Sequence, residues 1–161
     1  MPDDSRPVVI GLISDTHGLL RPSVHTALAG VDLILHAGDV GGSEILDELR
    51  IIAPVQAVYG NTDAPGDPNL QEEVIISSNG ISIHVSHGHE LGAPTAKRLM
   101  AAYPQDVLVY GHTHRQLVSR VDGRLIINPG AAGPRRFDVE PSVARLTITN
   151  GKAEVEIVPL D

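Results

Sequence analysis

The chain has no cysteine, and this absence excludes disulfide bonds, thiolate metal ligands and a cysteine nucleophile. Its core must therefore form without covalent cross-links. A chain of 161 residues can do this, because a domain of that length buries roughly 70% of the surface that its unfolded chain exposes. We expect a single domain over residues 1–161.

Aromatic residues are scarce, at 2% of the chain, and basic residues are fewer than acidic ones, which gives a formal net charge of -8. An extended nucleic-acid surface needs a basic face that neutralises phosphates, so the charge argues against such a partner. Few aromatic rings also leave little material for stacking unpaired bases. The first six residues are polar and the apolar run after them is short, so we expect no signal peptide, no membrane span and a cytoplasmic protein.

What the chain does contain is a set of short apolar segments that end in metal-binding side chains. The clearest covers residues 106–115, in which four apolar residues stop at Gly111 and are followed by His112 and His114. Four consecutive apolar residues fit a strand that is covered on both faces, and open α/β sheets place their sites at the carboxyl ends of such strands. Two imidazoles one residue apart suit two neighbouring ions better than one shared ion.

Four further segments repeat this design, each with a glycine near the end of the apolar run. Residues 10–18 end in Asp15 and His17, residues 33–39 in Asp39, residues 55–63 in Asn61 and Asp63, and residues 81–88 in His87. The sequence therefore predicts five strand ends that carry carboxylate, amide or imidazole ligands.

The order of the predicted elements indicates the fold class. Helices are predicted at about 22–28, 43–51 and 95–102, the second with Ser43 as its N-cap. Three hairpin turns are predicted in the second half, at Asn79-Gly80, Asp122-Gly123 and Asn150-Gly151. Early strand–helix–strand units followed by late hairpins predict an α/β protein with a four-layer α-β-β-α sandwich, made of two mixed sheets with flanking helices.

The motifs, taken in order, resemble those of the calcineurin-like metallophosphoesterase superfamily. The resemblance covers residues 10 to about 130 and rests on Asp15-Thr-His17, Gly38-Asp39, Gly60-Asn61, His87-Gly88 and Gly111-His-Thr-His114. Each motif is weak alone, but five in this order are highly specific. The short chain and the Gly60-Asn-Thr-Asp63 motif are similar to the small prokaryotic phosphodiesterase branch, which is related to the retromer scaffold subunit.

The resemblance implies a dinuclear metal centre. Asp15, His17 and His114 would hold one ion, Asn61, His87 and His112 would hold the other, and Asp39 would bridge the two. Oxygen and imidazole ligands suit divalent transition metals; manganese is the first expectation, with iron, zinc or nickel as alternatives. Two such ions against two carboxylates would leave positive charge that attracts a phosphate to an otherwise acidic protein.

The implied reaction is hydrolysis of a small phosphodiester, with a metal-bridging hydroxide as the nucleophile. The expected catalytic residues are Asp39, Asn61, His112 and Asp63. Asp63 would orient a ligand imidazole by accepting its second N–H, and His36 is a similar candidate. By the same resemblance, Asn128-Pro-Gly130 would place a backbone loop near the site.

Contacts to the substrate phosphate are expected from Asn61, His89, Arg135 and Arg136. For three of these a plainer interpretation stays open: His89 as a loop residue, and the two arginines as solvated surface charges.

One position departs from the pattern of many superfamily members. These have a histidine directly after the asparagine, where it is thought to protonate the leaving group, and here that position is Thr62. General acid catalysis typically contributes about 10²–10⁴-fold, so we expect a preference for good leaving groups and weak activity on monoesters. His89 is the candidate substitute.

Two other functions compete with a phosphodiesterase of small substrates. A binding scaffold that keeps the fold with weak metal affinity would be expected to lose ligands, whereas all seven candidate positions here carry metal-binding side chains. A nuclease would share the metal chemistry but would need a basic track. Small members of the family often associate, so a homo-oligomer is a further expectation.

Overall fold

The structure, a computed structural model, describes residues 6–64, 66–136 and 138–161. The strands of its first sheet are β1 (Val8–Ile13), β2 (Leu33–His36), β3 (Val55–Ala57), β9 (Ser142–Thr149) and β10 (Lys152–Pro159). Those of its second sheet are β4 (Val74–Ser78), β5 (Ile81–Val85), β6 (Val107–Val109), β7 (Leu117–Val121) and β8 (Arg124–Asn128). The helices are α1 (Ser23–Ala27), α2 (Ser43–Arg50) and α3 (Ala96–Ala102), with a 3-10 turn, η1, at His89–Leu91.

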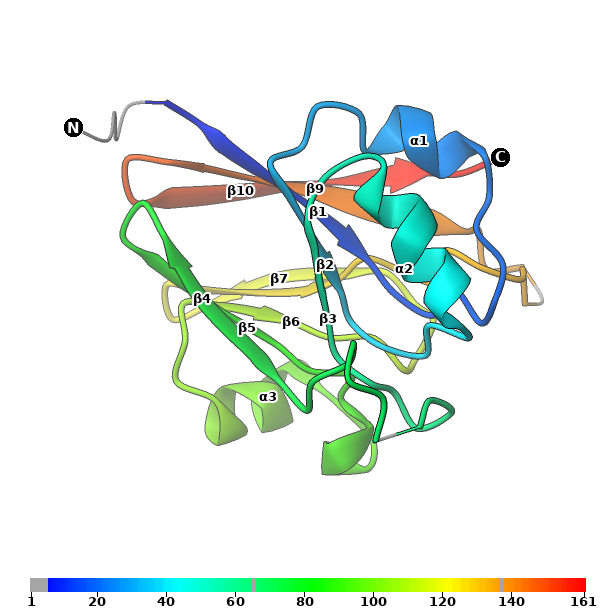
Figure 1. Ribbon diagram of the computed structural model, residues 1–161. Coiled ribbons are helices and arrows are strands. Elements are labelled where there is room, and N and C mark those ends of the chain that lie inside the picture. Colours follow the sequence, from blue (N-terminus) through cyan, green and yellow to red (C-terminus); the bar gives the residue numbers. More distant parts are fainter. Residues whose placement is uncertain (1–5, 65, 137) are drawn as a thin grey trace.

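The two sheets pack face to face and both mix parallel with antiparallel pairs (Figure 1). Their strand orders are β10-β9-β1-β2-β3 and β4-β5-β6-β8-β7. In the first sheet β1, β2 and β3 are parallel, and β9 and β10 add on antiparallel. In the second sheet β5, β6 and β8 are parallel, with β4 and β7 antiparallel at the edges.

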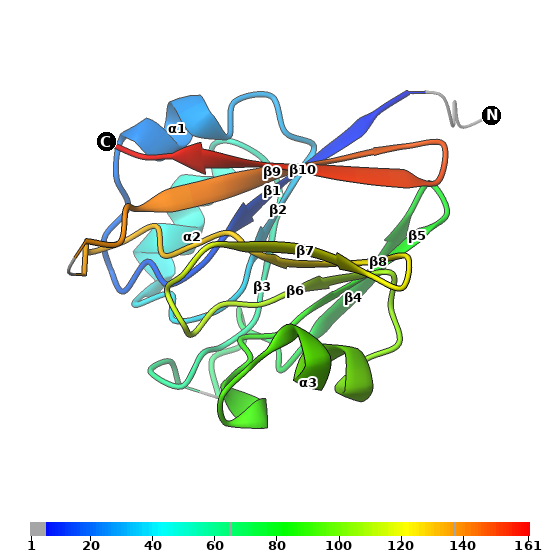
Figure 2. The ribbon, with the colours of Figure 1, turned by 180° about the vertical axis from the view of Figure 1, so that it is seen from behind.

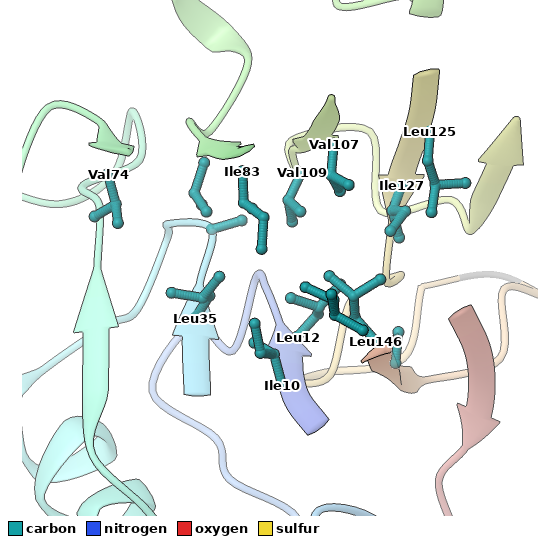
Figure 3. Close-up of a cluster of buried hydrophobic side chains, with 14 of the residues drawn as sticks. Ile10, Leu12, Leu35, Val74, Ile83, Val107, Val109, Leu125, Ile127 and Leu146 are labelled. Atoms are coloured by element: carbon teal, nitrogen blue, oxygen red, sulfur yellow. The ribbon is translucent and has the colours of Figure 1, made fainter. Parts of the chain in front are cut away.

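Three apolar clusters hold the layers together. Between the sheets, side chains from both inner faces interdigitate, among them Leu12, Leu35, Val109 and Ile127 (Figure 3). A second cluster joins the first sheet to α1 and α2, and a third, built around Leu99 and Leu108, joins the second sheet to α3. Figure 2 shows the helices on the two outer faces from behind. The predicted four-layer sandwich is therefore confirmed.

Strand β1 shows why the central strands are apolar throughout. Ile10 and Leu12 point into the cluster between the sheets, while Val9 and Ile13 point toward α1 and α2. Burying an isoleucine or leucine side chain stabilises the fold by about 1.5–3 kcal/mol relative to leaving it exposed. Both faces of β1 thus contribute, and no polar alternation is seen until the strand ends.

The three predicted hairpins are confirmed, and their turns lie on the left of the molecule in Figure 1. Asn79, Asp122 and Asn150 each have a positive φ, which asparagine and aspartate tolerate best among residues other than glycine. No helix in the described part of the chain is long and apolar enough to cross a membrane.

The predicted N-cap of α2 is wrong by one residue. Gly42 is the N-cap and Ser43 is the first helical residue, with no side-chain cap. Gly42 has a φ of 140°, a conformation that suits glycine, and the Glu44 carboxylate folds back over it. The charge of Glu44 thus stands at the positive end of the helix in place of a serine cap.

Candidate metal centre

The carboxyl ends of the parallel strands of both sheets lie at one edge of the sandwich. Asp15 and His17 follow β1, Asp39 follows β2, Asn61 follows β3, His87 follows β5, and His112 and His114 follow β6. The described residues form two groups whose ligand atoms could share an ion, because the atoms within each group lie within 4.8 Å of one another. One group is made by Asp15, His17 and His114, and the other by Asp15, Asp39 and His87. The first group is the predicted first ligand set. The second contains two of the residues predicted around the other ion.

The distances within these groups suit metal coordination. Asp15 Oδ1 lies 3.5 Å from His114 Nε2 and 3.9 Å from His17 Nε2, and the two Nε2 atoms are 3.3 Å apart. Ligand atoms that each lie about 2.0–2.2 Å from one ion are separated by about 3–4 Å. An ion at the centre of this triad would therefore meet all three ligands without a change of backbone.

Asp15 provides the clearest sign that a cation belongs here. Its carboxylate is fully buried; Oδ2 accepts hydrogen bonds from the Ser14 hydroxyl at 2.7 Å and from the His112 amide at 3.2 Å. Its Oδ1 atom is also buried but has no hydrogen-bond partner among the described residues. A buried carboxylate oxygen without a partner costs free energy, and a divalent cation would remove that cost.

Asp39 belongs to the second group and also lies close to His17 of the first. Its Oδ2 atom is 3.6 Å from His17 Nε2 and 3.2 Å from His87 Nε2. Its Oδ1 atom is occupied by Thr62, whose amide donates at 2.9 Å and whose hydroxyl donates at 2.8 Å. Thr62 thus fixes the rotation of the carboxylate, and Oδ2 is the oxygen that faces imidazoles from both groups.

His87 has a second partner that sets its tautomer. Its Nδ1 atom lies 2.8 Å from the carbonyl oxygen of Ala37, so Nδ1 carries a hydrogen and Nε2 is the nitrogen that faces the site. Asn61 Oδ1 lies 3.1 Å from His87 Nε2, which brings the predicted amide ligand to the same point.

His112 is close to the other ligands but not among them. Its ring lies 5.2 Å, centroid to centroid, from that of His87, and it is absent from both groups of closely spaced ligand atoms. Its backbone amide, by contrast, holds Asp15. The structure therefore brings six of the seven predicted ligands into direct proximity and places the seventh beside them.

Backbone strain concentrates at these positions. Asp15, His17, Asp39, His112 and His114 all have φ between 46° and 72°, the left-handed region that residues other than glycine rarely adopt. Such conformations cost about 1–3 kcal/mol each and cluster at functional sites. Since five of the seven predicted ligands share this conformation, the chain bends sharply at each strand end to turn the side chains inward.

Two glycines make the close approach of the strand ends possible. A Cβ on Gly60 would lie 2.0 Å from Asp39 Oδ1, and a Cβ on Gly111 would lie 2.1 Å from Ser14 Oγ and 2.7 Å from Asp15 Oδ2. Real Cβ atoms do not approach other atoms so closely. Gly111 therefore allows the end of β6 in one sheet to contact the end of β1 in the other.

Burial and charge shift the pKa values of the ligands. Burial raises the pKa of Asp15 to about 6, and a bound cation would act in the opposite direction. Burial alone would also raise the pKa of Asp39, but hydrogen bonds from His87 and Thr62 hold it well below its usual range. Burial, followed by the charge of Arg136, lowers the pKa of His114 to about 4, which leaves its imidazole neutral and able to bind a metal at pH 7.

Asp63 does not orient an imidazole, which corrects the prediction made for it. Its carboxylate accepts hydrogen bonds from the backbone amides of Val40, Gly41 and Gly60 at 2.9–3.1 Å. These amides belong to the loops that follow Asp39 and precede Asn61, so Asp63 holds two ligand-bearing loops together. Asp63 therefore bonds to backbone amides, and residue type and spacing in the sequence do not reveal such a role.

His36 likewise contacts neighbours of the ligands. Its Nε2 lies 3.0 Å from the Thr16 hydroxyl, which donates to the Val40 carbonyl, and its Nδ1 accepts from the Gly38 amide at 3.1 Å. This pattern requires a hydrogen on Nε2 and none on Nδ1. Burial lowers the pKa of His36 to about 3, in agreement with a neutral ring.

The predicted phosphate contacts differ in where they lie. The His89 ring lies 5.2 Å from that of His87 and 6.4 Å from that of His112, so it borders the site. Arg136 is exposed and close enough to His114 for its charge to lower the pKa of that imidazole. Arg135 is exposed on the same loop. The loop at Asn128-Pro-Gly130 also reaches the site. The side-chain amide of Asn128 donates a hydrogen bond to the hydroxyl of Thr113, which stands between His112 and His114 in the sequence.

The residues that hydrogen-bond to the predicted ligands, and so fix their positions, were not predicted from the sequence. Ser14, Thr16 and Thr62 all bond to ligands or to the loops that carry them, and Thr62 entered only as the residue that replaces a histidine. Ser14 and Thr16 flank Asp15 in the sequence, and the only signal was that both are polar at the end of an apolar strand.

Comparisons with family models, known sequences and solved structures found similar proteins. A family model described as the calcineurin-like phosphoesterase superfamily domain matches residues 8–151. A probable metallophosphoesterase of Methanocaldococcus jannaschii is 35% identical, over 96% of this chain and 82% of its own. A phosphodiesterase of the same organism is 29% identical, over 75% of this chain and 82% of its own. The crystal structure of wild-type Vps29 from Entamoeba histolytica complexed with zinc is 26% identical and has a TM-score of 0.76, covering 94% of this chain and 99% of that one.

Proposed function

The chain belongs to the calcineurin-like phosphoesterase superfamily, and from this premise we propose that it is a phosphodiesterase with two divalent metal ions. Hydrolysis of phosphoester bonds is the activity named for its relatives, one of which is a phosphodiesterase. The narrower proposal is that small phosphodiesters are its substrates and that the ligands at the strand ends act together on one phosphate.

The single observation that carries this proposal is the state of Asp15 Oδ1. The atom is buried and unpartnered among the described residues, and it faces the Nε2 atoms of His17, His87 and His114 at 3.5–3.9 Å. A buried carboxylate oxygen surrounded by imidazole nitrogens, with no sulfur ligand, suits a divalent transition metal. Manganese is our first expectation, and zinc, iron and nickel fit the same ligands.

The candidate ligands divide into two sets, one for each proposed ion. Asp15, His17 and His114 would hold one ion, His87 and Asn61 would hold the second, and Asp39 would be a ligand of both. Two divalent ions bound there supply Lewis acidity that lowers the pKa of water and stabilises the phosphoryl oxygens. His112, whose ring lies beside that of His87, would be the remaining ligand of the second ion.

Other side chains orient the substrate. Arg136, at the His114 side of the site, donates to a phosphate oxygen, since a guanidinium suits phosphate geometry. His89, beside His87, faces the opposite side of the same phosphate. Thr62 cannot replace the histidine that protonates leaving groups in many superfamily members, because its hydroxyl is committed to Asp39. Esters of acidic alcohols, such as p-nitrophenol, are therefore the favoured substrates.

The experiment that tests the proposal compares bis-p-nitrophenyl phosphate with p-nitrophenyl phosphate. We expect hydrolysis of the diester, loss of that activity in excess EDTA, recovery with added Mn²⁺, and slower hydrolysis of the monoester. The Asp39→Asn protein is the control and should show no recovery. Diesterase activity that survives EDTA would contradict the proposal.

The alternative is a protein-interaction scaffold with weak or no catalysis, and the structural likeness to Vps29 is the observation that favours it. The intact set of ligands argues for the enzyme, because a scaffold has no need for strained backbone at five ligand positions. A metal-loaded protein that hydrolyses no phosphodiester would favour the scaffold.

A further inference from the structure

A hollow of ≈ 350 Å³ lies next to the candidate metal centre. It is bounded by the loop after β2, the first turns of α2 and the segment that follows β3. Thr62 lines this hollow and also donates both of its hydrogen bonds to Asp39. A phosphodiester with its phosphorus at the centre would therefore have one of its two substituents within reach of the hollow.

The floor of the hollow is apolar and its wall offers hydrogen-bond donors. Val40, Leu46 and Leu70 line it and are buried. Gly42 and Ser43 open α2, and their backbone amides have no acceptor among the described residues. The floor side chains are almost fully covered by their neighbours, so an occupant would mainly meet the donors of the wall.

The charges around the hollow are of one sign. Asp63 and Asp67 line it, the Glu44 carboxylate folds over Gly42 beside it, and no lysine or arginine is among the described residues that line it. A substituent with further phosphates would be repelled. The lining residues that the structure describes include no aromatic ring, so a quaternary ammonium group would lack the ring faces on which such groups usually bind.

We propose that this hollow, called here the α2 pocket and lined by Val40, Gly42, Ser43, Leu46, Asp67 and Leu70, binds one alcohol component of the substrate. That component is uncharged, rich in oxygen and of about nucleoside size. The α2 amides donate to its oxygen atoms, and the Asp67 carboxylate accepts from its hydroxyl groups. This inference rests on the proposed function, because the pocket selects what is attached to the phosphate that the centre binds.

The test uses two diesters with the same p-nitrophenol leaving group. One is the p-nitrophenyl ester of thymidine 5′-phosphate, and the other is methyl p-nitrophenyl phosphate, whose methyl group is too small to fill the pocket. We expect kcat/KM to be at least about tenfold higher for the thymidine ester, mainly through a lower KM. In Ala64→Trp, where a large side chain enters the pocket, this ratio should fall close to one.

A matched substitution controls for the effect of a new tryptophan. Ala101 is exposed on α3, on the other side of the molecule from α2, so Ala101→Trp should leave the ratio of the two kcat/KM values as in the parent (Figure 1). Equal kcat/KM for both esters in the parent, or an unchanged ratio in Ala64→Trp, would overturn the inference. Faster hydrolysis of p-nitrophenyl phosphorylcholine than of the thymidine ester would overturn it in favour of a cationic substituent.

A binding experiment tests the α2 pocket even if the proposed phosphodiesterase activity is absent. If no diester is hydrolysed, calorimetric titration of the Mn²⁺-loaded protein with thymidine 5′-phosphate and with methyl phosphate still tests the pocket. Binding of the nucleotide at least about tenfold tighter in the parent, and not in Ala64→Trp, would support it. Equal affinity for the two phosphates would overturn it.

Discussion

Replacing Thr62 by valine should weaken metal binding although no proposed metal ligand changes. Valine has the shape of threonine, so the substitution removes the hydroxyl bond to Asp39 Oδ1 at 2.8 Å and keeps the amide bond at 2.9 Å. A hydrogen bond to a charged group has a net value of about 1.5–3 kcal/mol. Because Thr62 is exposed, water can replace part of this bond, and we expect the lower end of that range. Since about 1.4 kcal/mol is a factor of ten, metal affinity should fall about tenfold.

The assay for Thr62→Val is competition for Mn²⁺ against a chromophoric chelator. Thr62→Ser, which keeps the hydroxyl, is the matched control and should bind as the parent does. Circular dichroism of the metal-free proteins checks that the fold is retained in both. If the Thr62→Val protein binds Mn²⁺ as tightly as the parent, then Asp39 is held in place without the hydroxyl, which would contradict this prediction.

Three further predictions concern the framework of the site. Gly111→Ala should destabilise the fold by about 1–3 kcal/mol in thermal unfolding, because its Cβ would overlap Ser14 and Asp15, whereas Gly66→Ala has open space around it and should be neutral; similar losses in the two would contradict this. Asp63→Ala leaves three loop amides without their acceptor and should lower the free energy of unfolding in urea by at least about 2 kcal/mol; a loss under about 0.5 kcal/mol would show that water replaces the carboxylate. Because burial lowers the pKa of His36 from 6.5 to about 3, the unfolded chain takes up this proton first, and stability should fall toward acid by up to about 1.4 kcal/mol per pH unit within that interval. His36→Gln should lose this part of the slope, and equal slopes would refute the assignment of a neutral buried ring.

The fold could be predicted because its signals are local. Apolar runs such as residues 107–110 form the central strands, and the turn residues Asn79, Asp122 and Asn150 adopt the positive φ that their hairpins require. The error at Ser43 has a local cause as well. A serine at a helix start is usually a cap, but here the glycine before it takes the cap position and Glu44 supplies the negative charge.

The candidate site was predictable in its ligands but not in its supports. Ligand residues lie at strand ends, so the strand pattern and residue type together indicate them. The role of Asp63 depends on how the loops after β2 and β3 approach each other in space, which no sequence pattern encodes. The α2 pocket was beyond reach for the same reason, because its floor and wall come from segments that meet only in the folded chain.

Metal content, measured by elemental analysis after loading with Mn²⁺, is the most direct test of the dinuclear centre. We expect two ions per chain in the parent, loss at both positions in Asp39→Asn, and loss of mainly one ion in His114→Ala. Two ions in the parent with equal retention in the two variants would contradict the bridging role of Asp39. No bound metal in the parent would contradict the centre itself.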